Sequence, residues 1–346
     1  MDCLFHDYLH ATSCHPVSAI RNIPEGLWYN LIMKRYKPVS LRRIKTYPLA
    51  ARKSRMAKEL AAVPHRKGAS FRAFLNGLPS ILAADDFEAV VCAVVRARNS
   101  GRPVVLGMGA HPIKVGLSPV IIDLMRRGII TALATNGACI IHDFELFLMG
   151  RTSEDVGAQL CSGRFGMARE TGRELNTAIK KGVTRGFGIG RSVGEYIFRR
   201  KNGSTDTSIF SEGFRLGIPV TVHVALGADI IHMHPGADGG MIGEGSLRDF
   251  RLFASVISDL ERGVYINLGS AVIMPEVFLK ALTVARNLGN RVEDITTVNM
   301  DFIQHYRPRE NVLRRPTLAQ GRSYALTGHH EIMFPLLAAA IIEEAE

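Results

Sequence analysis

The sequence predicts an α/β fold in which a Rossmann-like parallel sheet is flanked by helices, within one domain over residues 69–346. Short apolar runs alternate with segments of helical spacing throughout this region, as in the strand–helix units of parallel sheets. Several of these runs end in glycine and small polar residues, which is typical of strand ends that bind ligands. No run reaches the roughly 18 residues that a membrane-spanning helix needs, so no membrane association is expected.

The stretch 101–150 holds the first strand–helix–strand–helix unit. Its strands are expected where apolar residues run uninterrupted into glycine, and its helices where apolar residues recur every three to four positions. The same two patterns predict six parallel strands in all. Helices are expected over 85–98, 119–127, 141–149, 167–185, 205–216, 247–260, 275–287 and 329–344, and strands over 103–106, 129–134, 219–225, 264–268, 295–298 and 324–326.

Two further stretches are rich in glycine. Residues 229–233 are interpreted as an additional short strand that runs into a glycine-rich loop over 232–246. The segment GFGIGRSVG at 186–194 is interpreted as a turn between helices, with phosphate binding as the alternative. A basic helix precedes it instead of a strand, and its glycine spacing departs from a dinucleotide-binding fingerprint.

The N-terminal part differs in character from the domain. Residues 1–32 show no clear period, and we interpret them as a non-native or disordered extension, with Met33 as the native start. Residues 33–68 form a basic arm with twelve Lys and Arg against one acid, which equals the net charge of +11 of the whole chain. We expect the arm to be solvated or to pack on a neighbouring subunit. Nucleic-acid binding is not expected, because the arm has no recognisable motif and few aromatic residues.

Five scattered cysteines without a CxxC pair indicate a reducing, cytoplasmic environment and no disulfide framework. Cys139 follows a strand-end glycine and could act as a nucleophile. A small buried side chain is the simpler interpretation of this residue.

The predicted strand ends provide the first candidate site. Glycines at these ends let a ligand approach the backbone, and helix N-termini nearby can hold phosphate, although strand ends also need glycine simply to turn. Asp301 would be placed to bind a ribose hydroxyl. The candidate residues are Gly107, Gly109, Asn136, Gly137, Gly269, Ser270, Asn299 and Asp301.

Three groups of titratable residues could carry chemistry. In the HDFE segment, Asp143 and Glu145 point in different directions on a helix, so one could face a pocket while the other caps or forms an ion pair. A pocket-facing carboxylate, with His142 beside it, could hold a cationic amine. His232 and His234 would lie on one face of a strand, a spacing usable for a metal ion, although HxH alone is weak support.

The third group lies at the start of the last helix. His329, together with His330, could reach the same strand-end pocket, or the two residues could serve only the helix start. His232, His234 or His329 could move protons near neutral pH.

These stretches together resemble the deoxyhypusine synthase family over roughly residues 100–342. The matching segments are ATNGACIIHDFEL at 134–146, TSIFSEGFRLGIPVTVHVALGADIIHMHP at 207–235 and LTGHHEIMFPLLAAAI at 326–341. ATNGACIIHDFELFLMG also resembles the NAD-dependent archaeal ornithine cyclodeaminase group. The resemblance implies a deoxyhypusine synthase-like, NAD-binding tetramer. Its NAD pocket carries over by position to Gly109, Thr135, Asn136, Gly137, Gly269, Ser270, Asn299 and Asp301.

One departure from the family limits what the resemblance implies. Met274 stands where the family has the lysine that forms a covalent imine, and a thioether cannot form one. The resemblance therefore implies an NAD-dependent enzyme that acts on a small cationic amine or amino acid, such as a polyamine or ornithine, and not deoxyhypusine synthesis itself. The alternatives are a metal-dependent hydrolase that uses His232 and His234, and a non-catalytic relative whose basic arm binds nucleic acid.

Overall fold

The computed structural model describes residues 37–200, 203 and 205–345, so the proposed extension 1–32 lies outside the described residues. The chain divides into two units, Met1–Arg55 and Met56–Glu346. The described part of the first unit is exposed and contains only the short 3-10 helices η2 (Leu41–Arg43) and η3 (Leu49–Ala51). Among the described residues, no helix combines the length and apolar character needed to cross a membrane.

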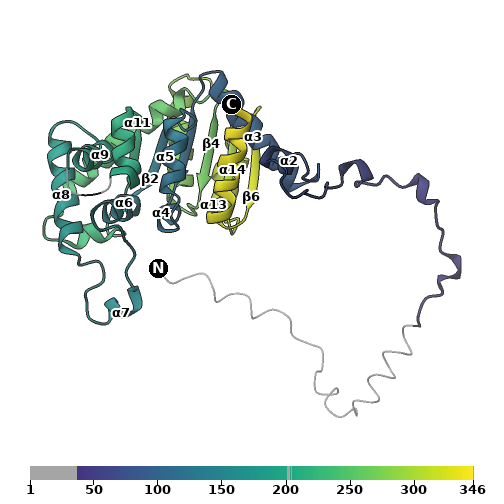
Figure 1. Cartoon of the computed structure of the whole chain (residues 1–346), viewed down its shortest axis with the longest axis horizontal. Coiled ribbons are helices and arrows are strands. Elements are labelled where there is room, and N and C mark those ends of the chain that lie inside the picture. The colour runs from purple at the N-terminus through teal and green to yellow at the C-terminus, as the bar shows by residue number, and fades with distance from the viewer. Residues whose placement is uncertain (1–36, 201–202, 204, 346) are drawn as a thin grey trace, which may run out of the picture. The chain divides into compact units, whose positions relative to one another are not determined.

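The second unit is built on a six-stranded sheet (Figure 1), and all of its strands are parallel, as the sequence predicts. The spatial order of the strands is β3-β2-β1-β4-β5-β6. The strands are β1 (Val104–Met108), β2 (Ala132–Asn136), β3 (Val220–His223), β4 (Val264–Leu268), β5 (Thr296–Asp301) and β6 (Arg322–Thr327).

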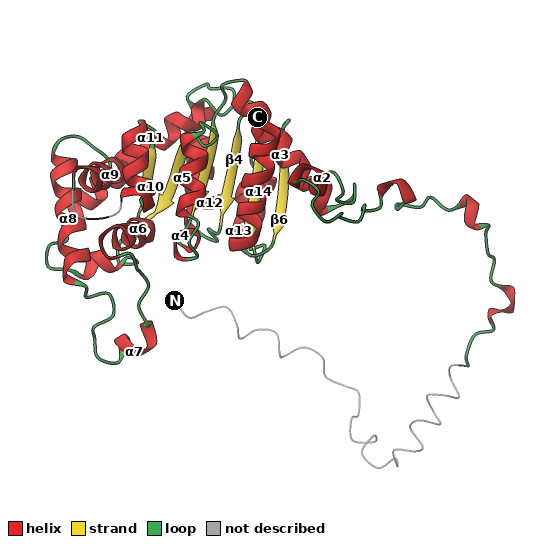
Figure 2. Ribbon diagram, in the orientation of Figure 1, coloured by secondary structure: helices red, strands yellow, loops and turns green. Residues whose placement is uncertain are grey.

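Helices cover both faces of the sheet (Figure 2), so its inner strands are buried on both sides. Alternate residues of β1 enter different cores: Val104 and Leu106 pack in one hydrophobic cluster, and Val105 packs in the other. The first cluster includes α3 (Ala83–Asn99), α5 (Ser118–Arg126), α6 (Gly137–Met149) and α14 (His330–Ala345), and the second includes α11 (Gly239–Ser258) and α12 (Ile273–Asn287).

Three further helices are α8 (Arg169–Thr184), α9 (Ile189–Arg199) and α10 (Ile209–Leu216). Helices α9 and α10 pack against β3, and α8 packs against α9 and α11. The interpretation of 186–194 as a turn is wrong beyond residue 188, because α9 begins at Ile189. Gly190 lies within this helix, and a Cβ there would lie 1.8 Å from the carbonyl oxygen of Val220. The glycine thus serves the close approach of α9 to β3.

The segment after β3 also differs from the prediction. Residues 230–233 form a 3-10 helix, η6 (Ile230–Met233), and no strand, because Asp229 and His232 form a capping box at its start. The predicted loop 232–246 ends early: α11 begins at Gly239, and the Asp238 side chain caps it by accepting a hydrogen bond from the Met241 N–H.

Short elements complete the unit. They are η4 (Lys58–Leu60), α2 (Phe71–Leu75), α4 (His111–Lys114), α7 (Val156–Leu160), η5 (Thr205–Thr207), α13 (Tyr306–Pro308) and the π-helix η7 (Arg309–Arg314).

Candidate functional site

The strand order reverses between β1 and β4. The chain proceeds outward from β1 through β2 to β3 on one side, and from β4 through β5 to β6 on the other. In parallel sheets of this kind, ligands bind outside the carboxyl ends of the strands at such a switch point. A Cβ on Gly109 would lie 2.7 Å from the carbonyl oxygen of Gly269, so the two backbones meet at this point.

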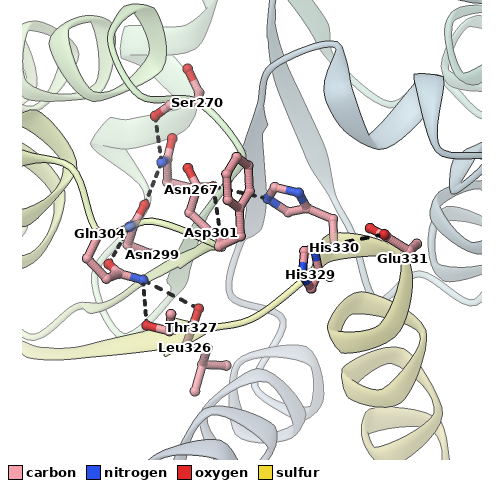
Figure 3. A network of polar contacts seen from close by, with 11 residues as sticks. Asn267, Ser270, Asn299, Asp301, Gln304, Leu326, Thr327, His329, His330 and Glu331 are labelled. Carbon is pink, nitrogen blue, oxygen red and sulfur yellow. Dashed lines mark hydrogen bonds and ion pairs between the residues drawn. The ribbon is translucent and has the colours of Figure 1, made fainter.

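A buried histidine lies next to this contact. Gly269 has a φ of +62°, and a Cβ there would lie 2.9 Å from Nε2 of His330. The His330 side chain is 1% exposed, and neither ring nitrogen has a hydrogen-bond partner within the described chain. Its Nε2 lies 3.6 Å from Oδ1 of Asp301 (Figure 3), and burial lowers the pKa of the imidazole.

A chain of amide groups joins the carboxyl ends of β4, β5 and β6 (Figure 3). Asn267 donates to the carbonyl of Ser270 at 2.9 Å and to Oδ1 of Asn299 at 2.7 Å. Asn299 donates to Gln304 at 2.6 Å, and Gln304 donates to the hydroxyl of Thr327 at 3.2 Å. Oδ1 of Asn267 remains a buried acceptor without a partner in the described chain. The amides fix the relative positions of the strand ends that flank the His330–Asp301 pair.

Other predicted cofactor residues have structural partners. Gly107 accommodates the hydroxyl of Tyr265, which would lie 2.2 Å from a Cβ on this glycine. The Thr135 hydroxyl donates to the carbonyl of Thr221 at 3.0 Å, and the Ser270 hydroxyl accepts the Met274 N–H at the start of α12.

The structure therefore separates the predicted strand-end residues into two groups. Those at β4 and β5 lie together beside Gly109 at the switch point. Residues 135–137 lie at the end of β2, on the far side of β1.

A cavity of about 220 Å³ lies beside the start of α6, near the end of β2. We call it the α6 cavity. Its charged and titratable lining residues come from α4, α6, the segment before α7 and the residue that caps η6. They are Lys114, His142, Glu145, Glu154 and Asp229.

Hydrogen bonds determine which tautomer His142 adopts in this cavity. The Thr152 hydroxyl donates its single hydrogen to Glu145 at 2.5 Å, so at 2.7 Å it accepts the Nδ1–H of His142. In the neutral ring Nε2 then carries the lone pair. Burial and nearby Lys114 lower the pKa of His142 to about 4, so the ring is neutral at pH 7.

Asp229 brings a second carboxylate to the cavity. A Cβ on Gly137 would lie 2.0 Å from Oδ2 of Asp229, so only glycine admits this carboxylate against the first turn of α6. Burial raises the pKa of Asp229 to about 6. Gly137 thus has a structural reason to be glycine in its contact with Asp229, and its role in cofactor binding stays a prediction.

Asp143 points away from the cavity, as expected for one of two carboxylates at this spacing. Its oxygens accept hydrogen bonds from the Ser208 hydroxyl at 2.5 Å and the Ile209 N–H at 2.8 Å. Asp143 is fully buried, and burial raises its pKa to about 7. This residue ties α6 to the start of α10, and Glu145 alone of the two faces the cavity.

The predicted pairing of His232 and His234 on one strand face is wrong, because they belong to η6 and its cap. Nδ1 of His232 accepts the Gly227 N–H at 3.2 Å, while Nε2 of His234 donates to the Gly166 carbonyl at 2.8 Å. Among the described residues, no group of three or more His, Cys, Asp or Glu side chains could hold a metal ion. The strand-face pairing of His232 and His234, on which the metal-dependent hydrolase alternative was based, is not found in the structure.

Of the two histidines at the start of the last helix, His330 faces inward and His329 does not. The His329 side chain is 70% exposed, with Glu331 4.0 Å away. His330 shares its helix face with the buried residues Phe334, Leu337 and Ile341. This i, i+4, i+7, i+11 pattern is the signal in the sequence that distinguishes the two.

Two other predicted positions are core residues. Met274, which the sequence comparison placed at the position of the lysine, is 0% exposed and packs from the first turn of α12 into the second hydrophobic cluster. Cys139 is also fully buried, burial raises the pKa of its thiol, and the simpler interpretation of a small core residue is confirmed.

The chain matches no family model and no curated protein by sequence. It is similar in structure to the apo form of ArgZ, an arginine dihydrolase of the cyanobacterial ornithine–ammonia cycle, with 15% identity and a TM-score of 0.48 over 77% of this chain and 34% of ArgZ. It is similar to AgrE in complex with ornithine and NAD+, with 17% identity and a TM-score of 0.49 over 80% of this chain and 34% of AgrE. A third similar structure is a candidate deoxyhypusine synthase from Entamoeba histolytica, with 13% identity and a TM-score of 0.49 over 81% of this chain and 95% of that one. The chain thus spans about a third of the length of ArgZ and AgrE.

Proposed function

We propose that this protein is an NAD-dependent enzyme that acts on a small cationic amine or amino acid. The observation that carries the proposal is the reversal of strand order between β1 and β4, with Gly109 and Gly269 in backbone contact beside a buried His330–Asp301 pair. The cofactor and the substrate of the proposed reaction would bind at two neighbouring places along the carboxyl ends of the strands. The dinucleotide lies at the switch point, and the amine lies in the α6 cavity.

The residues at the switch point fit a dinucleotide. Gly109 and Gly269 let two backbone segments meet at the switch point where a Cβ would clash, and Asn267 offers a buried acceptor without a partner in the described chain. Asp301 would accept from a ribose hydroxyl, as carboxylates at this position of a sheet do in dinucleotide sites. When bound, NAD supplies a hydride acceptor for the carbon that carries the amine.

The α6 cavity suits the substrate by its charge. Glu145, Glu154 and Asp229 provide three carboxylates against the single cation Lys114. The carboxylates attract an ammonium group, and Lys114 would pair with the carboxylate of an amino acid such as ornithine. Neutral His142 presents its Nε2 lone pair as a hydrogen-bond acceptor for an N–H group of the bound amine.

The proposal is tested by calorimetric titration of the full chain with NAD, followed by ornithine and spermidine in its presence. We expect micromolar NAD binding that weakens at least about tenfold in Asp301→Ala, the loss of one charge-assisted hydrogen bond. The matched control is Asp259→Ala. Asp259 pairs with Arg102 near the opposite edge of the sheet, where β1 and β4 begin, so its loss leaves NAD affinity unchanged.

Failure of the wild-type chain to bind NAD would end the proposal at its first step. If the chain bound NAD but no cationic amine, the proposed cofactor would stand and the proposed substrate class would be wrong. Tetramer formation stays a prediction that sedimentation of the same sample would check.

A further inference from the structure

Helices α8 and α9, which are labelled in Figure 1, carry many basic residues outside the proposed site. Residues 169–200 contain eight Lys and Arg but only three Glu. Two of these acids, Glu174 and Glu195, are buried and bound to arginines. The net charge of the arm over 33–68 equals that of the whole chain, so the positive and negative charges of all other residues cancel. The surplus of positive charge on residues 169–200 is therefore a local concentration.

Two adjoining depressions follow this surface. A groove of about 1030 Å³ lies between α8 and α9, and a pocket of about 430 Å³ lies between α8 and residues 234–236. Thr177 and Lys180 line both, so the two depressions are continuous along one face of α8. We call them together the α8 groove. Its charged lining residues are Arg169, Arg173, Lys180, Lys181, Arg185, Glu195, Arg199 and Arg200.

Three of these cations have no ion-pair partner among the residues that the structure describes. The side chains of Arg169, Lys180 and Lys181 are exposed and make no ion pair or hydrogen bond within the described chain. Arg169 and Lys180 are eleven residues apart on α8, which corresponds to about 16 Å at the rise of an α-helix. The two unpaired cations are therefore too far apart to contact a single anionic group, and a ligand with several anionic groups could contact both.

The other cations are fixed in place. Glu195 binds Arg185 and Arg199 at 2.7 Å each, and Glu174 binds Arg200. These guanidinium groups keep unused N–H donors while their positions are held by the buried carboxylates. They form a preorganised wall opposite the free lysines.

An amide in the pocket supplies a second, independent observation. Asn176 is 5% exposed, and its two amide hydrogens are used on the carbonyls of Gly172 and Ile231. Its Oδ1 has no partner within the described chain, although it is buried and the residue lines the pocket. A buried acceptor of this kind is satisfied by a ligand that brings an O–H or N–H donor.

We propose that the α8 groove binds a small ligand that carries a terminal di- or triphosphate and a hydroxyl or amine donor, in contrast to NAD, whose diphosphate is internal. Arg169 and Arg173 contact phosphoryl oxygens with their forked N–H groups, and Lys180 adds a point charge between the two depressions. A single-stranded nucleic acid fits less well. The aromatic ring of Phe187 is already stacked with Arg185 and Arg191, at 4.8 and 4.0 Å, and so is not free for a base.

The test is calorimetric titration of the full chain with inorganic tripolyphosphate and with adenosine triphosphate, which adds hydroxyl and amine donors. We expect both to bind, the nucleotide more tightly, and the affinity to fall at least about tenfold in the double variant Arg169→Gln, Lys180→Gln. The matched control is Lys280→Gln on α12, an exposed lysine remote in sequence, with unchanged affinity. All substituted side chains are exposed, so the variants keep the fold.

This proposal stands apart from the NAD site. Asp301→Ala leaves tripolyphosphate binding unchanged, and the double variant on α8 leaves NAD binding unchanged. Absence of tripolyphosphate binding, or equal binding by the double variant, would overturn the proposal. Binding of a single-stranded RNA oligomer without binding of tripolyphosphate would overturn it too, and would assign the surface to nucleic acid.

Discussion

Nε2 of His330 lies 3.6 Å from Oδ1 of Asp301, and both side chains are almost completely shielded from solvent. Asp301 ends β5, and His330 begins the helix that follows β6, so the pair bridges two neighbouring strand ends. Burial disfavours the imidazolium form, and the carboxylate partly opposes this effect. The two influences can be separated experimentally.

Substitution of Asp301 by Asn removes the negative charge and keeps the shape of the side chain. We expect the pKa of His330, already below its ordinary value, to fall further, because the carboxylate no longer stabilises the imidazolium. Titration of nitrogen-15-labelled histidine by NMR measures this directly. An unchanged pKa of His330 in the variant would show that the pair does not interact.

Asp143 and Glu145 are predicted to have separable roles. Asp143→Ala leaves the Ser208 hydroxyl and the Ile209 N–H buried without an acceptor, which costs about 1–3 kcal/mol of unfolding free energy. Chemical denaturation measures this loss. Asp123→Ala, which removes an exposed carboxylate that pairs with Arg127, serves as the control and costs less than about 0.5 kcal/mol.

Glu145→Gln is expected to act on ligand binding and not on folding. The amide oxygen still accepts from one of the Thr152 and Thr171 hydroxyls, and its NH2 group can donate to the oxygen of the other. The cavity loses one of three negative charges. Affinity for ornithine or spermidine therefore falls, with the denaturation midpoint unchanged. If Asp143→Ala abolished amine binding at full stability, the assignment of the two carboxylates would have to be reversed.

The parts of the fold that sequence reasoning predicts are those that local pattern determines. The strands carry short apolar or alternating stretches, and each main helix has a buried stripe, so local pattern indicates all six strands. The prediction covers only 324–326 of β6, because this edge strand is mostly exposed. The prediction of a strand at 229–233 is wrong because an apolar pair followed by HMH suits either a strand or a short helix. The capping interaction between Asp229 and His232 decides in favour of the helix.

The site is less accessible from sequence because it depends on distant contacts. Gly137 and Asp229 meet across more than ninety positions, and nothing local to either residue indicates this contact. His330 could have been preferred to His329 from its place on the buried stripe with Phe334 and Leu337. Choosing His330 as a site residue still requires the knowledge that the start of α14 lies beside the end of β5.

The docking of η6 on α8 gives a test of packing. A Cβ on Gly172 would lie 2.1 Å from Nδ1 of His234, so Gly172→Ala forces the imidazole out and costs about 1–3 kcal/mol. In a His234→Ala background the same substitution meets no ring, and the cost falls to near zero. Denaturation of the four proteins of this double-mutant cycle measures the coupling. Additive effects would mean that the ring does not occupy this position.

Amine binding in the α6 cavity is predicted to depend on pH through Asp229. Burial raises the pKa of this carboxyl to about 6, so it is ionised at pH 7.5 and mostly neutral at pH 5. A cationic amine favours the ionised form, and its affinity therefore rises as pH increases through about 6. Calorimetry with spermidine between pH 5 and 8, where its amines remain protonated over most of the range, follows this change. In Asp229→Asn the rise disappears, and affinity stays at the low-pH level throughout; a rise that persists in this variant would assign the titration to another group in the cavity.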